Sequence, residues 1–103
     1  MPYLKKQFLN MEIKFQEEFL FELNNQVYYI SKDKPAAARK FKNDLLRNIR
    51  KDLKNPFLFK KSQYYNEENI RDYVFKGYVS VYYINEHENS VYIFGFIKYK
   101  NSL

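Results

Sequence analysis

The spacing of apolar residues changes along this chain, and each change predicts a new element. Residues 11–15, MEIKF, alternate apolar and polar side chains, which is typical of a strand with one buried face. Gln16 to Ser31 and Pro35 to Lys54 instead carry apolar residues every three or four positions, so each predicts an amphipathic helix. Because the link between them is short, the two helices should pack as an antiparallel hairpin. Their predicted buried faces are Phe19, Leu20, Leu23, Val27 and Ile30 in the first helix and Ala38, Phe41, Leu45, Ile49 and Leu53 in the second.

The last third of the chain returns to strand patterning. Asn69 to Lys100 contains three runs rich in Val, Ile, Tyr and Phe, separated by Lys76-Gly77 and by Asn85 to Ser90. This pattern predicts a three-stranded antiparallel meander. Gly95 falls inside the last run, where glycine indicates a bulge or the close approach of another group. A connection of mixed character, residues 57–68, leads into the meander.

The predicted order is therefore one strand, two helices and three strands. This order indicates an α+β fold in which the antiparallel helical hairpin packs on one face of the antiparallel sheet. The other face of the sheet is expected to remain open for a partner. A chain of 103 residues fits one domain, residues 1–103, in which residues 1–10 form an N-terminal extension.

The charge of the chain points to acidic partners. Its net charge is +6, and aromatic residues make up 20% of the sequence. Basic and aromatic residues together are typical of nucleic-acid binders, because phosphates attract cations and bases stack on rings. The abundance of Lys, Asn, Ile, Phe and Tyr also follows from an AT-rich genome, and both explanations stand. The positive charge further predicts affinity for an acidic protein.

Several classes of protein and site are not supported by the sequence. The chain has no cysteine, so it forms neither a disulfide nor a cysteine-based zinc site. It has no apolar run of about 20 residues and no secretory signal pattern, so we predict a cytoplasmic protein. His87, between Glu86 and Glu88, is predicted to lie at a solvated hairpin tip. With no glycine-rich phosphate loop either, we predict no metal and no cofactor.

The basic residues near the ends of the meander are the candidate catalytic set. Arg71 begins one predicted strand, and Lys98 and Tyr99 end another. A guanidinium and an ammonium group would stabilise charge developing on a phosphodiester. Tyr99 would take the proton of a ribose 2′-hydroxyl if nearby cations lowered its pKa. The alternative is that Arg71 pairs with Asp72 or a glutamate and that the tail is only solvated. The lysines predicted to bind a nucleic-acid backbone are Lys54, Lys60, Lys61 and Lys100.

These elements and residues together resemble the RelE/ParE superfamily of bacterial toxins from type II toxin–antitoxin systems. The resemblance rests on the opening MEIKF, on Pro35 and the alanines before Phe41, on LKNP after the second helix, and on IRDYVFKGYVSVYYI and VYIFGFIKY in the meander. It implies a small basic protein that arrests growth when it is free. It also implies an antitoxin partner whose acidic, partly disordered segment folds over the toxin.

The resemblance implies two different activities. RelE-like members cut mRNA in the ribosomal A site, whereas ParE-like members inhibit DNA gyrase. The nucleases carry basic residues on the sheet and a Tyr or His near the C-terminus, and Arg71, Lys98 and Tyr99 fall at such positions. Lys54, Lys60 and Lys61 fall after the second helix, where some nucleases carry lysines. This chain departs from many relatives at Val79, where they have arginine, and over residues 94–97, which are apolar or glycine.

The prediction is therefore a growth-arresting toxin that cleaves mRNA on the ribosome. The first alternative is a ParE-like inhibitor of DNA gyrase without catalytic activity. The second is a basic binding module that is not toxic. Its predicted partners are an acidic antitoxin and the ribosome with its mRNA, or gyrase in the first alternative, and no membrane.

Overall fold

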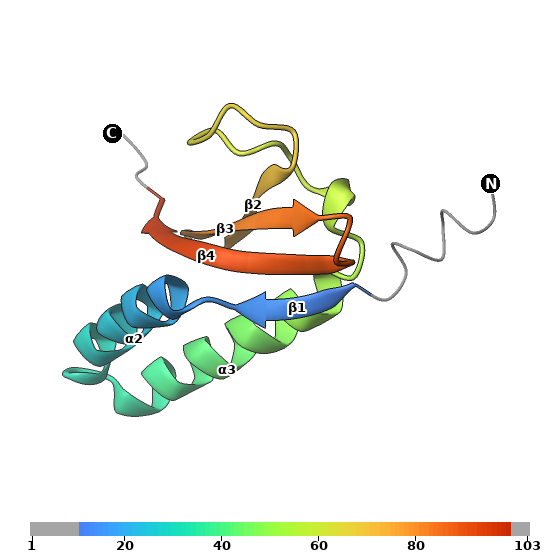
Figure 1. Cartoon of the computed structure of the whole chain (residues 1–103). Coiled ribbons are helices and arrows are strands. Elements are labelled where there is room, and N and C mark those ends of the chain that lie inside the picture. Colours follow the sequence, from blue (N-terminus) through green and yellow to red (C-terminus); the bar gives the residue numbers. More distant parts are fainter. Residues whose placement is uncertain (1–10, 100–103) are drawn as a thin grey trace.

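A mixed sheet with two helices on one face forms the body of the molecule (Figure 1). The structure is a computed structural model, and it describes residues 11–99. The elements in chain order are β1 (Glu12–Phe15), α2 (Glu17–Ser31), α3 (Pro35–Asp52), the short 3₁₀ helix η1 (Pro56–Leu58), β2 (Ile70–Phe75), β3 (Tyr78–Asn85) and β4 (Ser90–Lys98). The predicted α+β fold, with its helical hairpin and its meander, is confirmed.

The first strand completes the sheet by pairing with the last one. The sheet order is β1-β4-β3-β2, with β1 parallel to β4 and the other neighbours antiparallel. Glu12 lies opposite Ser90 and Phe15 lies opposite Ile93. The backbone N–H of Gln16 continues this ladder by donating to the carbonyl of Ile93 over 2.9 Å. The chain therefore passes directly from the sheet edge into α2, which begins at the next residue.

The core lies between the helices and the sheet. Phe19 and Leu23 of α2 and Leu45 and Ile49 of α3 are fully buried, as their three- and four-residue spacing predicts. They pack against alternate residues of the strands, which form the apolar face of the sheet. The helices stop where the sequence changes: Pro35 occupies the first turn of α3, and Pro56 opens η1. Neither helix is long and apolar enough to cross a bilayer, within the residues described.

Two buried tyrosines tie the end of α3 to the middle of the sheet. The hydroxyl of Tyr82 donates to the carbonyl of Pro56 over 2.6 Å. The hydroxyl of Tyr73 donates to the carboxylate of Asp52 over 2.5 Å. Burial raises the pKa of both phenols well above their ordinary value, and the hydrogen bond to Asp52 raises that of Tyr73 further. The folded protein therefore holds two phenolic protons that the unfolded chain releases at lower pH.

We expect these tyrosines to make the fold sensitive to alkali. A pKa raised by folding stabilises the protein fully below the unfolded pKa of about 10, and this stability is lost as the pH rises toward the folded pKa. Above pH 10, each tyrosine should lower the free energy of unfolding by more than about 1 kcal/mol per pH unit. Urea unfolding measured from pH 8 to 11.5 checks this, and Tyr82→Phe should reduce the slope by about one proton. Tyr28→Phe, on the exposed side of α2, is the matched control, and an equal reduction there would contradict the prediction.

The β3–β4 hairpin matches its sequence signals. A bulge lies where Val81 pairs with Gly95 and Tyr82 pairs with Ile93, as the glycine inside the strand indicated. A Cβ atom added to Gly95 would lie 3.3 Å from that of Val81, so this position favours glycine. His87 is exposed at the tip of the hairpin, as predicted.

The sheet face away from the helices is only partly open. Ile70, Val79 and Val81 form a second buried cluster there, with Phe94 and Ile97 packed beside it. Residues 59–69, the connecting segment, fold back over this face, and the ring of Tyr65 meets that of Phe94 edge-on at 5.5 Å. The sequence predicted that this whole face would be open to a partner. In the structure, the part that remains open lies near the β2–β3 turn.

Candidate functional site

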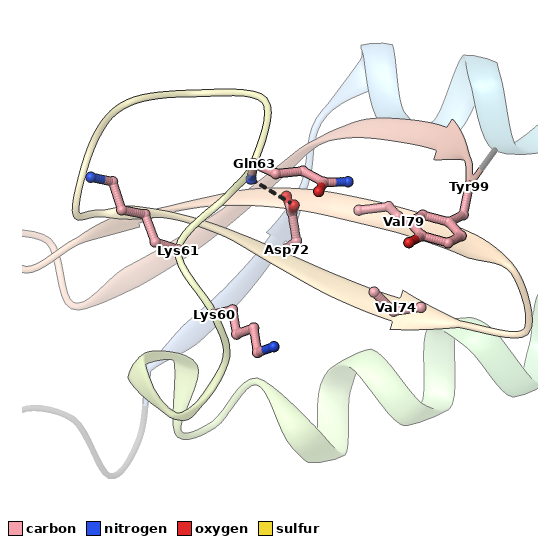
Figure 2. A pocket seen from close by; sticks show the side chains of 7 residues that line it. All are labelled: Lys60, Lys61, Gln63, Asp72, Val74, Val79 and Tyr99. Carbon is pink, nitrogen blue, oxygen red and sulfur yellow. Dashed lines mark hydrogen bonds between the residues drawn. The ribbon is translucent and has the colours of Figure 1, made fainter. Parts of the chain in front are cut away.

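A pocket of about 400 Å³ lies on the narrowed sheet face (Figure 2). Asp72, Val74 and Val79 rise from the strands to form its floor, and Tyr99 lies beside Val79. The connecting segment supplies the remaining wall. The residues that line the pocket are Lys60, Lys61, Gln63, Asp72, Val74, Val79 and Tyr99.

Backbone pairing with the sheet edge holds Lys60 and Lys61, which form the lysine wall of the pocket, in place. Lys61 forms an antiparallel bridge with Arg71, and the N–H of Asp72 donates to the carbonyl of Lys60 over 3.1 Å. The N–H of Ser62 donates to the carbonyl of Ile70 over 2.8 Å. The connecting segment thus adds a short stretch of strand to β2, and it also covers an edge that would otherwise be open to other chains.

Tyr99 reaches the pocket because the ladder continues past β4. Its backbone N–H donates to the carbonyl of Gly77 over 2.8 Å. Lys76 and Gly77 both have positive φ angles, 49° and 82°, which a tight hairpin turn requires. The Tyr99 side chain is 45% exposed, so its ring and hydroxyl are available to a ligand.

Asp72 makes the pocket electrostatically mixed. One carboxylate oxygen accepts the backbone N–H of Gln63 over 3.1 Å, while the other is buried and has no hydrogen-bond partner among the described residues. The ammonium groups of Lys60 and Lys61 lie on exposed residues at the rim. Lys60 and Lys61 at the rim attract a phosphate, whereas the carboxylate of Asp72 on the floor repels it. The pocket is therefore less suited to binding a phosphate at its floor than to contacting the surface of another molecule with its rim.

Arg71 does not line the pocket. Its side chain lies on the other side of β2 from Asp72, since neighbouring strand residues point to opposite faces. Its guanidinium donates to the carbonyl of Phe59 and to that of Glu68, each over 2.8 Å, and pairs with the Glu68 carboxylate at 3.1 Å. It also lies 5.1 Å from the ring of Phe57. The alternative pairing of Arg71 with a glutamate is the one observed.

The other predicted residues are dispersed. Arg71 lies opposite Tyr82, five positions along β3 from Gly77, so about 16 Å of strand separates it from the Tyr99 backbone. Lys98 lies opposite Tyr78, whose ring packs on Phe41 of α3, so Lys98 is on the helix side of the sheet. Lys54 is exposed after α3, outside the pocket lining. Lys100 lies outside the described residues.

The pocket therefore unites Lys60, Lys61 and Tyr99, and it separates them from Arg71 and Lys98. The site residues predicted from the sequence did not include Gln63, Asp72, Val74 or Val79. The alternation of β2 was the available signal, since it places Asp72 and Val74 on one face. No cluster of three or more metal-ligating side chains occurs within residues 11–99. The arrangement offers cations, one phenol, two valines and one carboxylate to a bound surface.

Comparison with known proteins identifies relatives of this fold. Residues 13–100 match the model of the family described as the ParE toxin of the type II toxin–antitoxin system, parDE. The chromosomal ParDE system of P. aeruginosa contains a chain with a TM-score of 0.71 and 11% identity, the match covering 90% of this chain and 99% of that one. The isolated RelE toxin of E. coli gives a TM-score of 0.53 and 16% identity, covering 89% and 87%. No curated protein sequence matches the chain.

Proposed function

This chain belongs to the family of ParE toxins of type II toxin–antitoxin systems, and on that premise we propose that it arrests growth by binding DNA gyrase. The inhibition would need no catalytic step by the toxin. Gyrase would be held inactive as long as the toxin remained bound. We infer that it acts in the cytoplasm, where gyrase is found.

The separation of the candidate catalytic residues carries this proposal. Catalysis of phosphodiester cleavage requires charge-stabilising and proton-transferring groups within reach of one phosphate. Arg71 is bound to Phe59 and Glu68 on the helix side of β2, and Lys98 is also on the helix side. Tyr99 is left on the opposite face with Lys60, Lys61 and Asp72, one of whose carboxylate oxygens has no hydrogen-bond partner within residues 11–99. This set supports binding better than cutting.

The pocket rim has the composition of a protein-binding surface. Val74 is 60% exposed beside the half-exposed Tyr99, and Lys60 and Lys61 border both. An exposed apolar centre with an aromatic ring and a charged rim is typical of protein interfaces. We propose that this rim contacts the target.

Cleavage of mRNA on the ribosome is the second candidate function. The observation that favours it is that Lys60, Lys61 and Tyr99 line one pocket. In this mechanism Tyr99, as its phenolate, would take the proton of the ribose 2′-hydroxyl, whose oxygen would then bond to the phosphorus and displace the 5′-oxygen of the next nucleotide. One of the two ammonium groups would give a proton to that 5′-oxygen, and both would stabilise charge on the phosphate. Arg71 would then support the site by holding the connecting segment that carries the lysines.

The partner implied by the family is an antitoxin. With a net charge of +6, this chain should attract an acidic partner segment. We propose that such a segment crosses the rim of the pocket and neutralises Lys60 and Lys61. An antitoxin bound there would exclude the cellular target directly.

Tyr99→Phe separates the two functions. This change removes the hydroxyl and keeps the ring, so a gyrase-binding toxin should retain its toxicity and its inhibition of supercoiling within about threefold. A nuclease that uses the hydroxyl for proton transfer should lose about 10²- to 10⁴-fold in cleavage rate. The measurements are gyrase supercoiling in vitro and primer extension on reporter mRNA after induction. Tyr83→Phe, another partly exposed tyrosine of the sheet, is the matched control.

The two assays also decide the proposal as a whole. Inhibited supercoiling with intact transcripts supports gyrase as the target. Normal supercoiling at excess toxin, together with cut transcripts, would establish mRNA cleavage instead. Harmless expression without an antitoxin would argue for a binding module that is not toxic.

A further inference from the structure

The outward side of α2 carries three exposed aromatic residues. Phe21 is 64% exposed, Tyr28 is 67% exposed and Tyr29 is 66% exposed. The opposite side of the helix holds Phe19 and Leu23, which are fully buried against the core. At 100° per residue, Phe21 and Tyr28 lie about 20° apart and point away from the sheet. Exposed apolar patches of this kind mark interaction sites.

The spacing on this side is that of a helix-pairing seam. Glu17, Phe21, Asn24 and Tyr28 follow one another at intervals of four, three and four residues, and Lys32 caps the helix four residues later. Intervals of three and four keep side chains on one stripe that faces a partner helix. The stripe therefore has an acidic residue at one end, a basic residue at the other, and two aromatic residues, one on either side of a central amide.

This order is self-complementary when the helix is reversed. Two copies of α2 can run antiparallel about a two-fold axis that passes between Asn24 and Asn25. In that register, the numbers of two facing residues always sum to 49. Phe21 then faces Tyr28 of the second copy, and Glu17 faces Lys32 of the second copy. The two-fold axis repeats each contact, as a symmetric dimer requires.

We propose that the protein forms a symmetric dimer through antiparallel pairing of its α2 helices. Asn24 and Asn25 would lie at the axis. The side-chain oxygen of Asn24 already accepts the ammonium group of Lys42 of α3 over 2.7 Å, which fixes its orientation there. A polar pair at the centre of an apolar seam fixes the register, because any shift leaves the amides against rings. The charges favour a second copy of this chain as the partner. Each α2 carries Glu17 at one end of the seam and Lys32 at the other, so an antiparallel copy places opposite charges together at both ends.

The surface of α2 already has the shape for this contact. A shallow hollow of about 660 Å³ is lined by Leu20 and Phe21 and rimmed by Glu17, Glu18 and Glu22. In the proposed register, Phe21 faces Tyr28 of the second copy, beside this hollow. The ammonium nitrogen of Lys32 lies 5.2 Å from the centre of its own Tyr28 ring, so the ring and the cation are presented together. The ring fills the hollow while the cation meets its acidic rim.

The dimer leaves the candidate site accessible. The helices cover one face of the sheet, and the pocket of Lys60, Lys61 and Tyr99 lies on the other (Figures 1 and 2). A single helix pair buries less than the roughly 1,600 Å² of a standard interface, so we expect a dissociation constant on the order of 100 μM. The dimer thus forms at high local concentration without blocking the pocket.

Cysteine crosslinking tests the antiparallel register. The chain contains no cysteine, so each introduced thiol is unique. A mixture of the Glu17→Cys and Lys32→Cys proteins should form a covalent dimer on mild oxidation, and its remaining Glu17 and Lys32 still form the second charge pair. Either variant alone should not, because equivalent residues would lie 15 positions apart, about 22 Å along the helices, beyond the reach of a disulfide. Crosslinking of each variant alone would indicate parallel pairing and overturn the proposal.

Sedimentation equilibrium of the uncrosslinked protein gives an independent test. Wild-type protein should associate between about 10 μM and 1 mM, and Phe21→Ser should weaken association at least tenfold. Leu58→Ser, which removes a 79% exposed leucine outside α2, should leave association unchanged. Glu17→Lys should weaken association, and adding Lys32→Glu to it should restore association. Wild-type protein that stays monomeric over this range overturns the proposal. If Phe21→Ser then weakens antitoxin binding, the surface belongs to the antitoxin.

Discussion

Arg71→Ala is expected to lower the free energy of unfolding by about 2–4 kcal/mol, because the charged guanidinium that bonds the carbonyls of Phe59 and Glu68 is removed. The Arg71 side chain is only 14% exposed. Its guanidinium joins the carbonyl of Phe59, before the lysine wall, to Glu68, just ahead of β2. Without it, the carbonyl of Phe59 loses this donor, and the ring of Phe57 loses its contact with the guanidinium. Urea unfolding measures the loss of stability, and limited proteolysis at Lys60 and Lys61 measures the opening of the segment.

The nature of the change separates a structural role of Arg71 from a catalytic one. Arg71→Lys keeps the charge but lacks the fork that reaches two carbonyls, so it should recover less than half of the lost stability. Arg39→Ala, which removes an exposed arginine of α3, should change stability by less than about 0.5 kcal/mol. If Arg71→Ala abolished toxicity while leaving stability and proteolysis unchanged, Arg71 would have to act on the target itself.

Reversing the charge of the pocket rim should abolish growth arrest. The double variant Lys60→Glu and Lys61→Glu replaces the two ammonium groups that we propose contact the target with two carboxylates. Rim charges govern the encounter between partners, and like charges across an interface oppose it strongly, so we expect at least about a 100-fold loss of target affinity. Both lysines are exposed, and the fold should remain stable within about 1 kcal/mol. Growth after induction and affinity for purified gyrase are the measurements.

A matched variant controls for net charge. Lys34→Glu with Lys51→Glu also replaces two exposed lysines, and each double variant lowers the net charge from +6 by 4 to +2. We expect the control to retain at least half of the wild-type affinity. Equal losses in both variants would mean that overall charge, and not the pocket, determines binding. Full toxicity of the Lys60 and Lys61 variant would exclude this rim as the target surface.

Local patterning was sufficient to predict the elements, because each depends mainly on its own residues. The period of apolar positions predicted β1, both helices and the meander, and the prolines marked the helix ends. The strand that pairs with β1 could not be predicted in this way. Its pairing with β4 depends on residues 78 positions later, and nothing in MEIKF specifies which edge it joins.

The candidate site was harder to predict, for two physical reasons. Residues adjacent in a strand point to opposite faces of the sheet. Lys98 and Tyr99 were predicted to belong to one site because they are neighbours in the sequence, but their side chains lie on opposite faces. Arg71 was grouped with them by charge, whereas its position beside Glu68 and the returning connecting segment determines its contacts. The fold of the connecting segment, residues 59–69, depends on pairing with β2, and the pattern of its own residues does not show that pairing.

The parallel pairing of β1 with β4 has a consequence for synthesis. A nascent chain that has produced β1, α2 and α3 has no sheet against which to bury Leu45 and Ile49, because β4 lies between β1 and the rest of the sheet. Pairing residues that are 78 positions apart also slows folding relative to a chain with local contacts. We therefore expect this protein to remain unfolded, and harmless, until translation has passed β4. That delay gives an antitoxin made nearby time to meet its toxin before the toxin can act.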